Sequence, residues 1–539
     1  TYATFDSALS NAKAGDTITL LENVTVHNTD ANMWCTTIDK PITLDLNGKT
    51  IFGPNDMGNN KYNFAVLYIK ADTTIIDSAS NGGINAQTNG AYCINVMNGA
   101  QLTINAGTYY GGGTAVQVQK GTLIINGGTF NCEPYSNPTY GYKFLINCVD
   151  SAYRDGTAKI IIKGGSFINY DPSDSASENP RGNFCAPGYV AVKNDATENP
   201  VWTVEDHRVA EVEGTGYTTL ASAIAEADNK TVTLLKDVTE DLVIPADKTV
   251  TLDLNGKKLT NVSSNTITNN GTLTITGTGT VDNVTHQKAA LYNKGTATVE
   301  GGTYTRSAEA SSATNSGNNS YYVIDNYGTL TINKGTFKFS DTNAGAFSSL
   351  IHNGWYDGSQ NTSGQNAVMT INDGNFTQGT GGKITVKNDD YGKLEIKGGV
   401  FTQPQSNYYC VYNYNIAKIS GGTINGYVGN EYASTTTYDK GLLEISNEAV
   451  INGGIQSRTK ANQTSSNDQN LIKITDNAKV AGAITSVDAK YVTVSGGYFT
   501  SDPTPYCGTK DGKQLTGVAS KDSSYPYTVG EKNAESKLA

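Results

Sequence analysis

The chain has 539 residues, too many for one ordinary hydrophobic core, so we expect two or more folding units or a solenoid. Only 17% of the residues are charged, glycine (58) and tyrosine (32) are abundant and methionine (4) is scarce, which argues against a helical bundle, a coiled coil and an α/β enzyme. The net charge of −11 argues against nucleic-acid binding, and the lack of any stretch of about 20 apolar residues argues against membrane insertion.

The first element that the sequence predicts is a short helix directly after Thr4. Thr4 can cap a helix N-terminus, and Ala and Leu follow at helical spacing. The pattern returns after Thr219, because residues 217–224 resemble residues 2–9. We expect each helix to cap the exposed backbone edge of a first β-coil.

A short phrase that recurs along the chain predicts β-strands. It reads GTLIINGGTF at residues 121–130 and GTLTINKGTF at residues 328–337. Apolar residues alternate with Thr, Lys or Glu, as in Leu394-Glu395-Ile396-Lys397, which is typical of a strand with one buried face. The closing glycines suit a sharp corner because they accept positive φ.

The spacing of this phrase separates the possible repeat architectures. Counterparts of Leu330 in the second half stand 20 to 39 residues apart, at residues 273, 297, 330, 369, 394, 417, 443, 472 and 492. Immunoglobulin-like domains repeat at longer intervals, and propeller blades at about 40–50 residues. A fixed core phrase with loops of variable length instead predicts an all-β fold, the right-handed parallel β-helix (solenoid).

A longer repeat divides the coils into two tandem modules. The phrase LDLNGK occurs at residues 44–49 and 252–257, and both halves close with a Phe, an Asp-Pro pair and a Cys. We predict β-helix module 1 at residues 1–204 and β-helix module 2 at residues 205–531, each with a short N-terminal capping helix. Residues 532–539 are interpreted as a partly vector-derived tail. Because we recognise no signal peptide or anchor, we interpret the chain as a fragment of a larger protein.

A recurrent corner in module 2, such as Asn326-Tyr327-Gly328, supplies candidate binding residues. The first position, Asn or Asp, can bond its own turn and the third tolerates left-handed φ, so the middle residue should point outward. Asp390-Tyr391-Gly392 is aligned with the same corner. Stacked coils would then form one exposed stripe of Asn270, Lys294, Tyr327, Asn366, Tyr391, Tyr414 and Lys440.

Tyrosine rings beside Asn and Lys suit sugar rings, and they equally suit a protein partner. The simpler alternative is that the stripe consists of ordinary solvated turn residues. Long insertions add candidates: Trp355 within residues 338–366, Tyr321-Tyr322 within residues 305–322, and Trp34 in module 1.

The sequence contains no recognisable catalytic or metal-binding motif. Its seven cysteines are scattered without CxxC spacing, so we predict small buried side chains rather than a zinc or iron–sulfur site. The four histidines have no partner at metal-ligand spacing, and hydrolase, metalloprotease and nucleotide-binding phrases are missing. We therefore assign no catalytic residue, no metal and no cofactor.

On the helix pattern, the LDLNGK phrase and the GTLTIxxGTF coils, both modules resemble the pectin-lyase-like β-helix domains found in tandem on large adhesin-like surface proteins of Gram-positive gut bacteria. The resemblance implies an extracellular location at a bacterial cell surface. Polysaccharide-cleaving members place carboxylates on neighbouring coils. Here Asn28-Thr29-Asp30 and Asp389-Asp390 lie about 360 residues apart, in different predicted modules, and cannot form such a site.

The leading hypothesis is a non-enzymatic, adhesin-like surface protein that binds a host or microbial glycan or surface protein, such as mucin or immunoglobulin. One alternative is a carbohydrate-active module that binds or cleaves polysaccharide. A second alternative is a structural spacer, and an enzyme with an unfamiliar site is a third.

Overall fold

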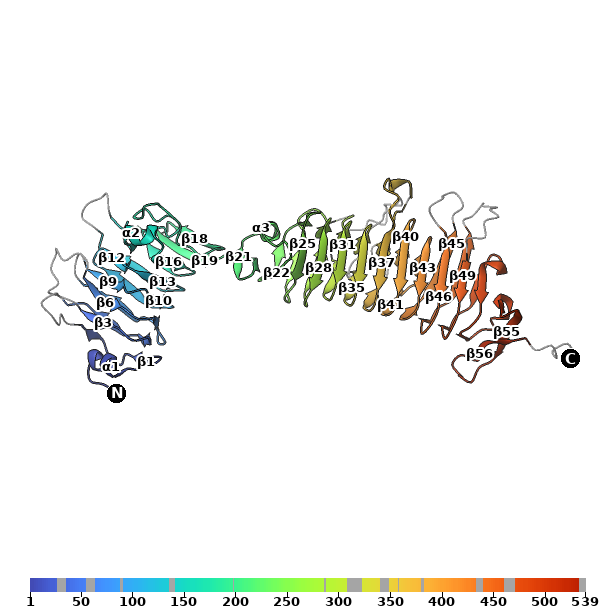
Figure 1. The fold of residues 1–539 in the computed structure, drawn as a ribbon, viewed down its shortest axis with the longest axis horizontal. Helices are drawn as coiled ribbons and strands as arrows, with labels where there is room; N and C mark the ends of the chain where they lie inside the picture. Colours follow the sequence, from blue (N-terminus) through green and yellow to red (C-terminus); the bar gives the residue numbers. More distant parts are fainter. Residues whose placement is uncertain are drawn as a thin grey trace. The chain divides into compact units, whose positions relative to one another are not determined.

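The computed structural model describes residues 1–26, 35–54, 64–87, 91–134, 141–196, 198–285, 287–307, 322–339, 349–356, 358–379, 382–432, 440–459 and 471–532. The chain forms two compact units, Thr1–Arg208 (unit 1) and Val209–Ala539 (unit 2). Most regular structure in the described residues is β-strand, which confirms the predicted all-β class (Figure 1). Within these ranges, no helix is long and apolar enough to cross a membrane.

Unit 1 distributes its successive strands over three sheets, A, B and C, so that each coil contributes to all three. Sheet A contains β1 (Thr17–Thr19), β4 (Ile42–Asp45), β7 (Thr73–Ile76), β10 (Ala100–Ile104), β13 (Gly121–Ile125) and β16 (Ala158–Ile162). Sheet B contains β2 (Val24–Thr25), β5 (Thr50–Phe52), β8 (Gly83–Asn85), β11 (Thr108–Gly111), β14 (Thr129–Cys132), β17 (Ser166–Ile168), β19 (Val201–Asp206) and β18 (Tyr189–Asn194). Sheet C contains β3 (Thr36–Ile38), β6 (Ala65–Ile69), β9 (Tyr92–Val96), β12 (Thr114–Val118) and β15 (Ile146–Cys148).

Unit 2 repeats this arrangement in sheets D, E and F. Sheet D contains β21 (Thr215–Tyr217), β20 (Ala210–Val212), β22 (Lys230–Leu234), β25 (Thr249–Asp253), β28 (Thr272–Thr276), β31 (Thr296–Val299), β34 (Thr329–Ile332), β37 (Ala367–Ile371), β40 (Gly392–Ile396), β43 (Ile416–Ile419), β46 (Leu442–Ile445), β49 (Leu471–Ile474) and β52 (Val492–Val494). Sheet E contains β23 (Val238–Thr239), β26 (Lys258–Thr260), β29 (Thr280–Asn283), β32 (Thr303–Arg306), β35 (Thr336–Phe339), β38 (Asn375–Thr377), β41 (Val400–Thr402), β44 (Thr423–Asn425), β47 (Val450–Ile451), β50 (Lys479–Val480), β53 (Tyr498–Phe499), β56 (Tyr527–Glu531), β55 (Lys513–Ala519) and β54 (Thr509–Lys510). Sheet F contains β24 (Leu242–Ile244), β27 (Ile267–Asn269), β30 (Leu291–Asn293), β33 (Ile324–Asn326), β36 (Ser349–Asn353), β39 (Ile384–Asn388), β42 (Tyr409–Asn413), β45 (Tyr427–Tyr432), β48 (Ile455–Thr459) and β51 (Ile484–Ser486).

The coils stack through parallel pairing of every third strand. For example, β28 pairs with β31 so that Leu273 lies beside Ala297, and β31 pairs with β34 so that Ala297 lies beside Leu330. These three residues are among the positions that the sequence marked as equivalent. Each unit is therefore a stack of three-sided coils joined by long parallel sheets, the arrangement of a parallel β-solenoid.

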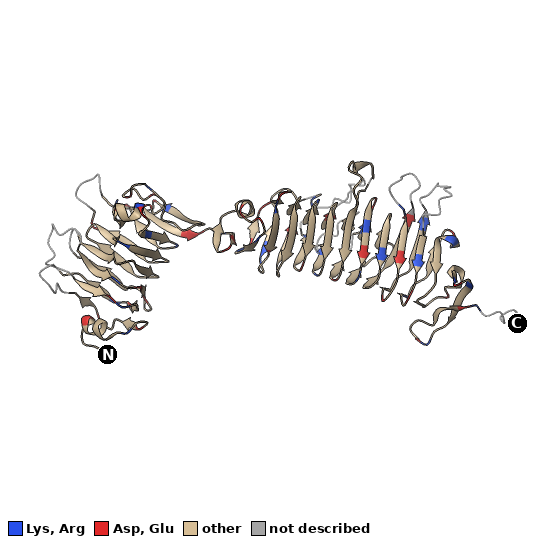
Figure 2. Ribbon diagram, in the orientation of Figure 1, with Lys and Arg blue, Asp and Glu red and all other residues tan. Residues whose placement is uncertain are grey.

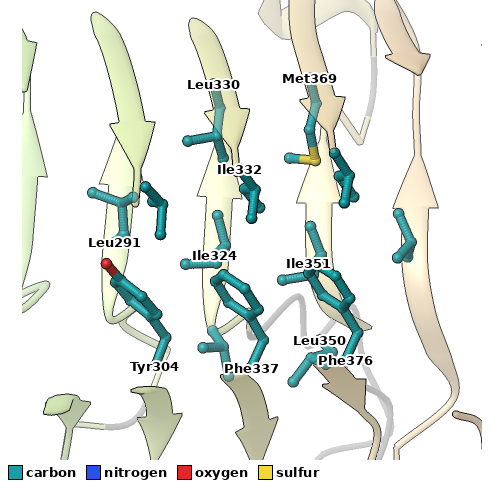
Figure 3. Close-up of a cluster of buried hydrophobic side chains, with 14 of the residues drawn as sticks. Leu291, Tyr304, Ile324, Leu330, Ile332, Phe337, Leu350, Ile351, Met369 and Phe376 are labelled. Carbon is teal, nitrogen blue, oxygen red and sulfur yellow. The ribbon is translucent and has the colours of Figure 1, made fainter. Parts of the chain in front are cut away.

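The core lies inside the coils and is built from repeated layers. In unit 2, Phe337 is fully buried, and its ring stacks on Tyr304 at 5.0 Å and on Phe376 at 4.6 Å between centroids (Figure 3). In unit 1, Phe130 is stacked in the same way between Tyr109 and Phe167. The inward-facing row thus places like side chains above one another, because the register of the parallel sheets repeats from coil to coil.

The outer face of sheet D carries few charges, and those in its later strands alternate in sign (Figure 2). Glu395, Lys418, Glu444 and Lys473 occupy one row of register on β40, β43, β46 and β49. Lys418 Nζ lies 3.5 Å from Glu444 Oε1. Alternation of sign avoids like-charge neighbours across the parallel strands, and such exposed pairs contribute little to stability.

Short helices precede the first coils. Helix α1 (Phe5–Asn11) begins after Thr4, whose side chain accepts a hydrogen bond from the Ser7 backbone N–H. Helix α3 (Leu220–Ala225) begins after Thr219 in the same way, and it buries Leu220, Ala223 and Ile224. A third helix among the described residues, α2 (Asp150–Arg154), lies between β15 and β16.

Candidate binding face

A ladder of buried asparagines in sheet F connects the recurrent corners of unit 2, of which Asn326-Tyr327-Gly328 is one. In each coil the Nδ2 of one Asn donates to Oδ1 of the next at 2.7–2.8 Å. Asn326 also donates to the Gly328 carbonyl oxygen at 3.1 Å, so the predicted bond to the residue's own turn exists. The ladder holds the corners in register, and it consists of Asn269, Asn293, Asn326, Asn353, Asn388, Asn413 and Asn430.

One predicted corner alignment is wrong. The sequence aligned Asp390 with Asn326, but Asn388 occupies the ladder position and pairs with Asn353. Asp389 and Asp390 are extra residues in the corner, and they precede Tyr391, whose φ is 59°. The triplets look alike because both have an acidic or amide residue two positions before glycine, and only the register of β39 identifies the inward residue.

The preceding coil also differs from the prediction, because extra residues again separate its ladder asparagine from the next strand of sheet D. Asn353 holds its ladder position, and the residue that follows it is Gly354. Asn366, which we placed in the stripe, instead directly precedes β37 at the end of a longer segment. Trp355 therefore lies next to the ladder, whereas Asn366 does not follow a ladder residue.

Outward-facing side chains of neighbouring strands form a buried ionic cluster beside the ladder. Asp325 on β33, His352 on β36 and Lys387 on β39 occupy one row of register. His352 Nδ1 lies 2.7 Å from Asp325 Oδ1, and its Nε2 lies 3.5 Å from Asp389 Oδ2. Lys387 Nζ lies 2.5 Å from Asp389 Oδ2. The tyrosine ring of Tyr322 stacks on the imidazole with 4.2 Å between centroids.

Burial and charge act in opposite directions on this cluster. Burial disfavours the imidazolium form of His352, but the two carboxylates beside it outweigh burial and raise its pKa above the ordinary value. Burial likewise disfavours ionised Asp389, but Lys387 and His352 outweigh it and lower the pKa of that carboxyl. Each buried charge thus has a charged partner, as buried ionic groups require.

Aromatic side chains lie over the ionic cluster and form a continuous group. Tyr327 contacts Tyr292 and Trp355, each with 5.4 Å between ring centroids. Trp355 contacts Tyr391 at 6.1 Å. The Trp355 backbone N–H donates to the Asp390 carbonyl oxygen at 3.0 Å, which attaches the insertion to the corner of the next coil.

A second aromatic group continues along sheet F. Tyr412 on β42 stacks with Tyr409 at 4.3 Å and makes an edge contact with Tyr414 at 4.8 Å. Lys387 Nζ lies 5.4 Å from the Tyr414 ring centroid, so the lysine connects the ionic cluster to this second group. The Tyr412 hydroxyl donates to Glu431.

The predicted site residues fall into two classes. Tyr327, Tyr391, Tyr414 and Trp355 are half-buried, whereas Lys294 and Lys440 are exposed. The three tyrosines of the predicted stripe are partly covered, because neighbouring aromatic rings pack against them. Lys294 Nζ lies 5.3 Å from the Tyr292 ring centroid, which places this lysine beside the aromatic group.

A cavity of about 270 Å³ opens beside the ionic cluster. The described residues that line it combine two aromatic rings, amide groups, an ammonium group and a carboxylate. Asp325 is common to the cavity and to the ionic cluster. The lining residues are Asn265, Gln287, Lys288, Ala289, Tyr292, Tyr322 and Asp325.

Sequence reasoning missed the most chemically distinctive side chains of this face. Tyr292, Asp325, His352, Lys387 and Tyr412 each directly precede a ladder asparagine. The repeated order of an apolar residue, a variable residue and Asn was the signal that could have found them. Its middle position faces outward when the asparagine faces inward.

The described residues contain no group of three or more His, Cys, Asp or Glu side chains that could hold a metal ion. Cys35, Cys93, Cys132, Cys148 and Cys410 are buried as predicted, whereas Cys185 and Cys507 are partly exposed. Burial raises the pKa of Cys410 and of Cys132 to about 12. Trp34, Tyr321 and residues 28–30 lie outside the described residues, as does the predicted tail beyond Lys532.

A scan against protein-family models and searches of curated proteins and of solved structures found no match to this chain.

Proposed function

We propose that this chain is a non-enzymatic, extracellular binding protein that presents the aromatic outer face of sheet F in unit 2 to a glycan. The units are proposed to be right-handed parallel β-helix modules in tandem, with α1 and α3 as capping helices. On their sequence motifs they resemble the pectin-lyase-like modules of bacterial surface, adhesin-like proteins. That resemblance motivates the proposed location at a bacterial cell surface.

The observation that carries the proposal is an aromatic face beside a small polar cavity. Half-buried rings offer a flat apolar surface to a sugar ring, and their position is held by mutual packing rather than by flexible loops. Asn265, Gln287 and Lys288 supply hydrogen-bonding groups at the cavity beside Tyr292. A few oriented polar groups beside aromatic walls are what a neutral, hydroxyl-rich ligand requires.

A glycan array that includes mucin-type sugars, probed with the full chain, tests the proposal. We expect a saturable hit whose affinity falls about tenfold or more on Trp355→Ala and on Tyr327→Ala, since a central aromatic contact is worth about 2 kcal/mol. Tyr498→Ala is the matched control, because Tyr498 is a half-buried tyrosine of sheet E in the same unit. Its affinity should equal that of the unmodified chain.

Other outcomes would favour the alternatives. Binding to immunoglobulin or another protein, with the same two variants affected, would keep the face and change the ligand class. If the chain bound none of the glycans or proteins tested, the structural-spacer alternative would be favoured. Asp325, a carboxylate in the cavity backed by His352, is the residue to examine for polysaccharide cleavage. If the unmodified chain released oligosaccharides from a polysaccharide and Asp325→Asn did not, the non-enzymatic proposal would be wrong.

A further inference from the structure

An insertion that follows β36 lies against the buried ionic cluster of unit 2. The structure describes its residues 354–356 and 358–366. The Trp355 backbone N–H donates to the Asp390 carbonyl oxygen at 3.0 Å, and the Gly358 N–H donates to Asp390 Oδ2 at 2.9 Å. Asp390 is 6% exposed, so one buried residue of the next coil holds the insertion at two points.

Two aromatic side chains of the insertion contact the cluster. The Tyr356 ring centroid lies 4.9 Å from Lys387 Nζ. Trp355 contacts the Tyr327 ring, and the Tyr327 ring centroid lies 5.8 Å from that of His352. The position of the insertion therefore depends on side chains that surround the buried imidazole.

Polar contacts also run from the imidazole to the residue that holds the insertion. His352 Nε2 lies 3.5 Å from Asp389 Oδ2, and the Asp390 backbone N–H donates to Asp389 Oδ1 at 3.2 Å. The Asp389 carboxylate thus connects His352 to Asp390. A change in the charge of the imidazole reaches the attachment of the insertion through one side chain.

His352 can donate to both of its carboxylate partners only when it is protonated. Imidazolium has an N–H on each ring nitrogen, whereas neutral imidazole has one donor and one acceptor. Nδ1 lies 2.7 Å from Asp325 Oδ1, and Nε2 faces Asp389. Loss of the proton directs a nitrogen lone pair at one of these carboxylates. The cluster then contains two carboxylates and the single ammonium group of Lys387.

The imidazole is the group of this cluster that titrates near neutral pH. Carboxyl groups ordinarily titrate well below neutral pH, and lysine and tyrosine well above it. The described tyrosines in ring contact with the imidazole are Tyr322 and Tyr327, and burial raises the pKa of Tyr327 further above its ordinary value of 10. The pKa of His352 is raised above 6.5, because its two carboxylate partners outweigh burial.

We propose that His352 is a pH-dependent switch for the insertion: its imidazolium form holds the insertion closed over the ionic cluster, and loss of the proton releases it. Deprotonation leaves an uncompensated negative charge in the closed form, and opening to water relieves this charge. Because the raised pKa belongs to the closed form, closure is strongest below pH 6.5 and weakens as pH rises through that pKa.

Hydrogen exchange at the Trp355 and Gly358 amides of the full chain, from about pH 5 to about pH 9 and without ligand, tests the proposal. Each rate is divided by the intrinsic rate at the same pH, so that only protection is compared. NMR resonances of the His352 ring mark its titration in the same samples. We expect protection of both amides to fall at least tenfold as His352 loses its proton.

Two variants separate the charge of His352 from its packing. His352→Gln cannot carry the charge, so protection should be low at every pH. Asp325→Asn keeps the side-chain size and removes the carboxylate nearest to Nδ1, so the midpoint should move down by about 1 pH unit. The control His207→Gln, at an exposed histidine of unit 1, should behave as the parent does. Protection that is constant with pH in the parent, or an unchanged midpoint in Asp325→Asn, would overturn the proposal.

A consequence for binding rests on the proposed function. Trp355 belongs to the proposed glycan-binding face, so glycan affinity should fall over the same pH range as the protection of its amide. The exchange measurement needs no ligand, and the two proposals can therefore fail separately. Protection that depends on pH in a chain that binds no glycan would reject the proposed function and keep the switch. Glycan binding with constant protection would reject the switch and keep the proposed function.

Discussion

Asn353 illustrates how a single polar residue can stabilise the interior of a solenoid. Its Nδ2 donates to Asn388 Oδ1 at 2.8 Å and to the Lys393 carbonyl oxygen at 3.2 Å, and its Oδ1 accepts from Asn326. We predict that Asn353→Ala lowers the free energy of unfolding of unit 2 by about 2–3 kcal/mol, because it leaves buried partners unsatisfied. Urea titration measures the change.

The control for this prediction is Asn372→Ala. Asn372 also donates an amide bond to an asparagine, Asn333, at 2.7 Å, but the pair is exposed. Water can replace that bond, so the cost should be below about 0.5 kcal/mol. Equal losses in the two variants would show that burial of the ladder does not determine its contribution.

His352 should make the stability of unit 2 depend on pH. Its pKa is raised above the ordinary value of 6.5, since the effect of Asp325 and Asp389 exceeds that of burial. A raised pKa in the folded state stabilises the fold fully below pH 6.5, and this contribution is lost as pH rises through the folded-state pKa. We predict that the urea midpoint of unit 2 falls across this range and that His352→Gln flattens the dependence.

Trp355 provides the reporter for this measurement. The chain has three tryptophans, so Trp34→Phe and Trp202→Phe leave only Trp355, within unit 2. The lowered pKa of Asp389 changes the stability in the opposite direction of pH. Its stabilising contribution is present above pH 3.8 and is lost as pH falls through the folded-state pKa. A midpoint that rises with pH above 6.5 in the parent and not in His352→Gln would contradict the assigned sign.

At the scale of the element, α3 is attached to its coil by a carboxylate from another segment. Glu240 Oε2 accepts from the Leu220 N–H and its Oε1 from the Ala221 N–H, both at 2.8 Å. We predict that Glu240→Ala accelerates hydrogen exchange of these two amides about 5- to 30-fold, which corresponds to a loss of 1–2 kcal/mol. Glu226→Ala, at the exposed C-terminal end of α3, should leave them unchanged.

The strands were more predictable than the corners, for a physical reason. Alternation of apolar and polar residues specifies which side chains enter the core, and the marker residues Leu273, Ala297 and Leu330 do lie side by side. A corner of variable length has no such period. Asp390 and Asn326 looked equivalent in the sequence, and only pairing across β36 and β39 shows that Asn388 is the inward residue.

The candidate site depended on contacts that local sequence does not specify. The tyrosines were found through their corners, but their packing against Trp355 depends on where a long insertion lies over the coils. The ionic cluster joins residues 325, 352, 387 and 389, which are brought together by stacking. A one-residue error in the corner register would turn these side chains toward the other face.

At the scale of the whole molecule, the two units have separate hydrophobic cores that share no residue. In a solenoid each coil is stabilised mainly by its neighbours, so a core defect should act within the unit that contains it. Phe130 and Phe337 form a matched pair, since both are fully buried and stack between two aromatic rings. Replacing either with Ala should cost about 3–5 kcal/mol.

We predict that each replacement destabilises one unit only. Phe337→Ala should lower the urea midpoint reported by Trp355 and leave the midpoint of unit 1 unchanged. Phe130→Ala should do the reverse, with unit 1 followed by Trp34 and Trp202 in a Trp355→Phe background. If both replacements shifted both midpoints equally, the two cores would unfold as one cooperative system. Separate shifts would instead allow each unit to be mutated and tested for binding without disturbing the other.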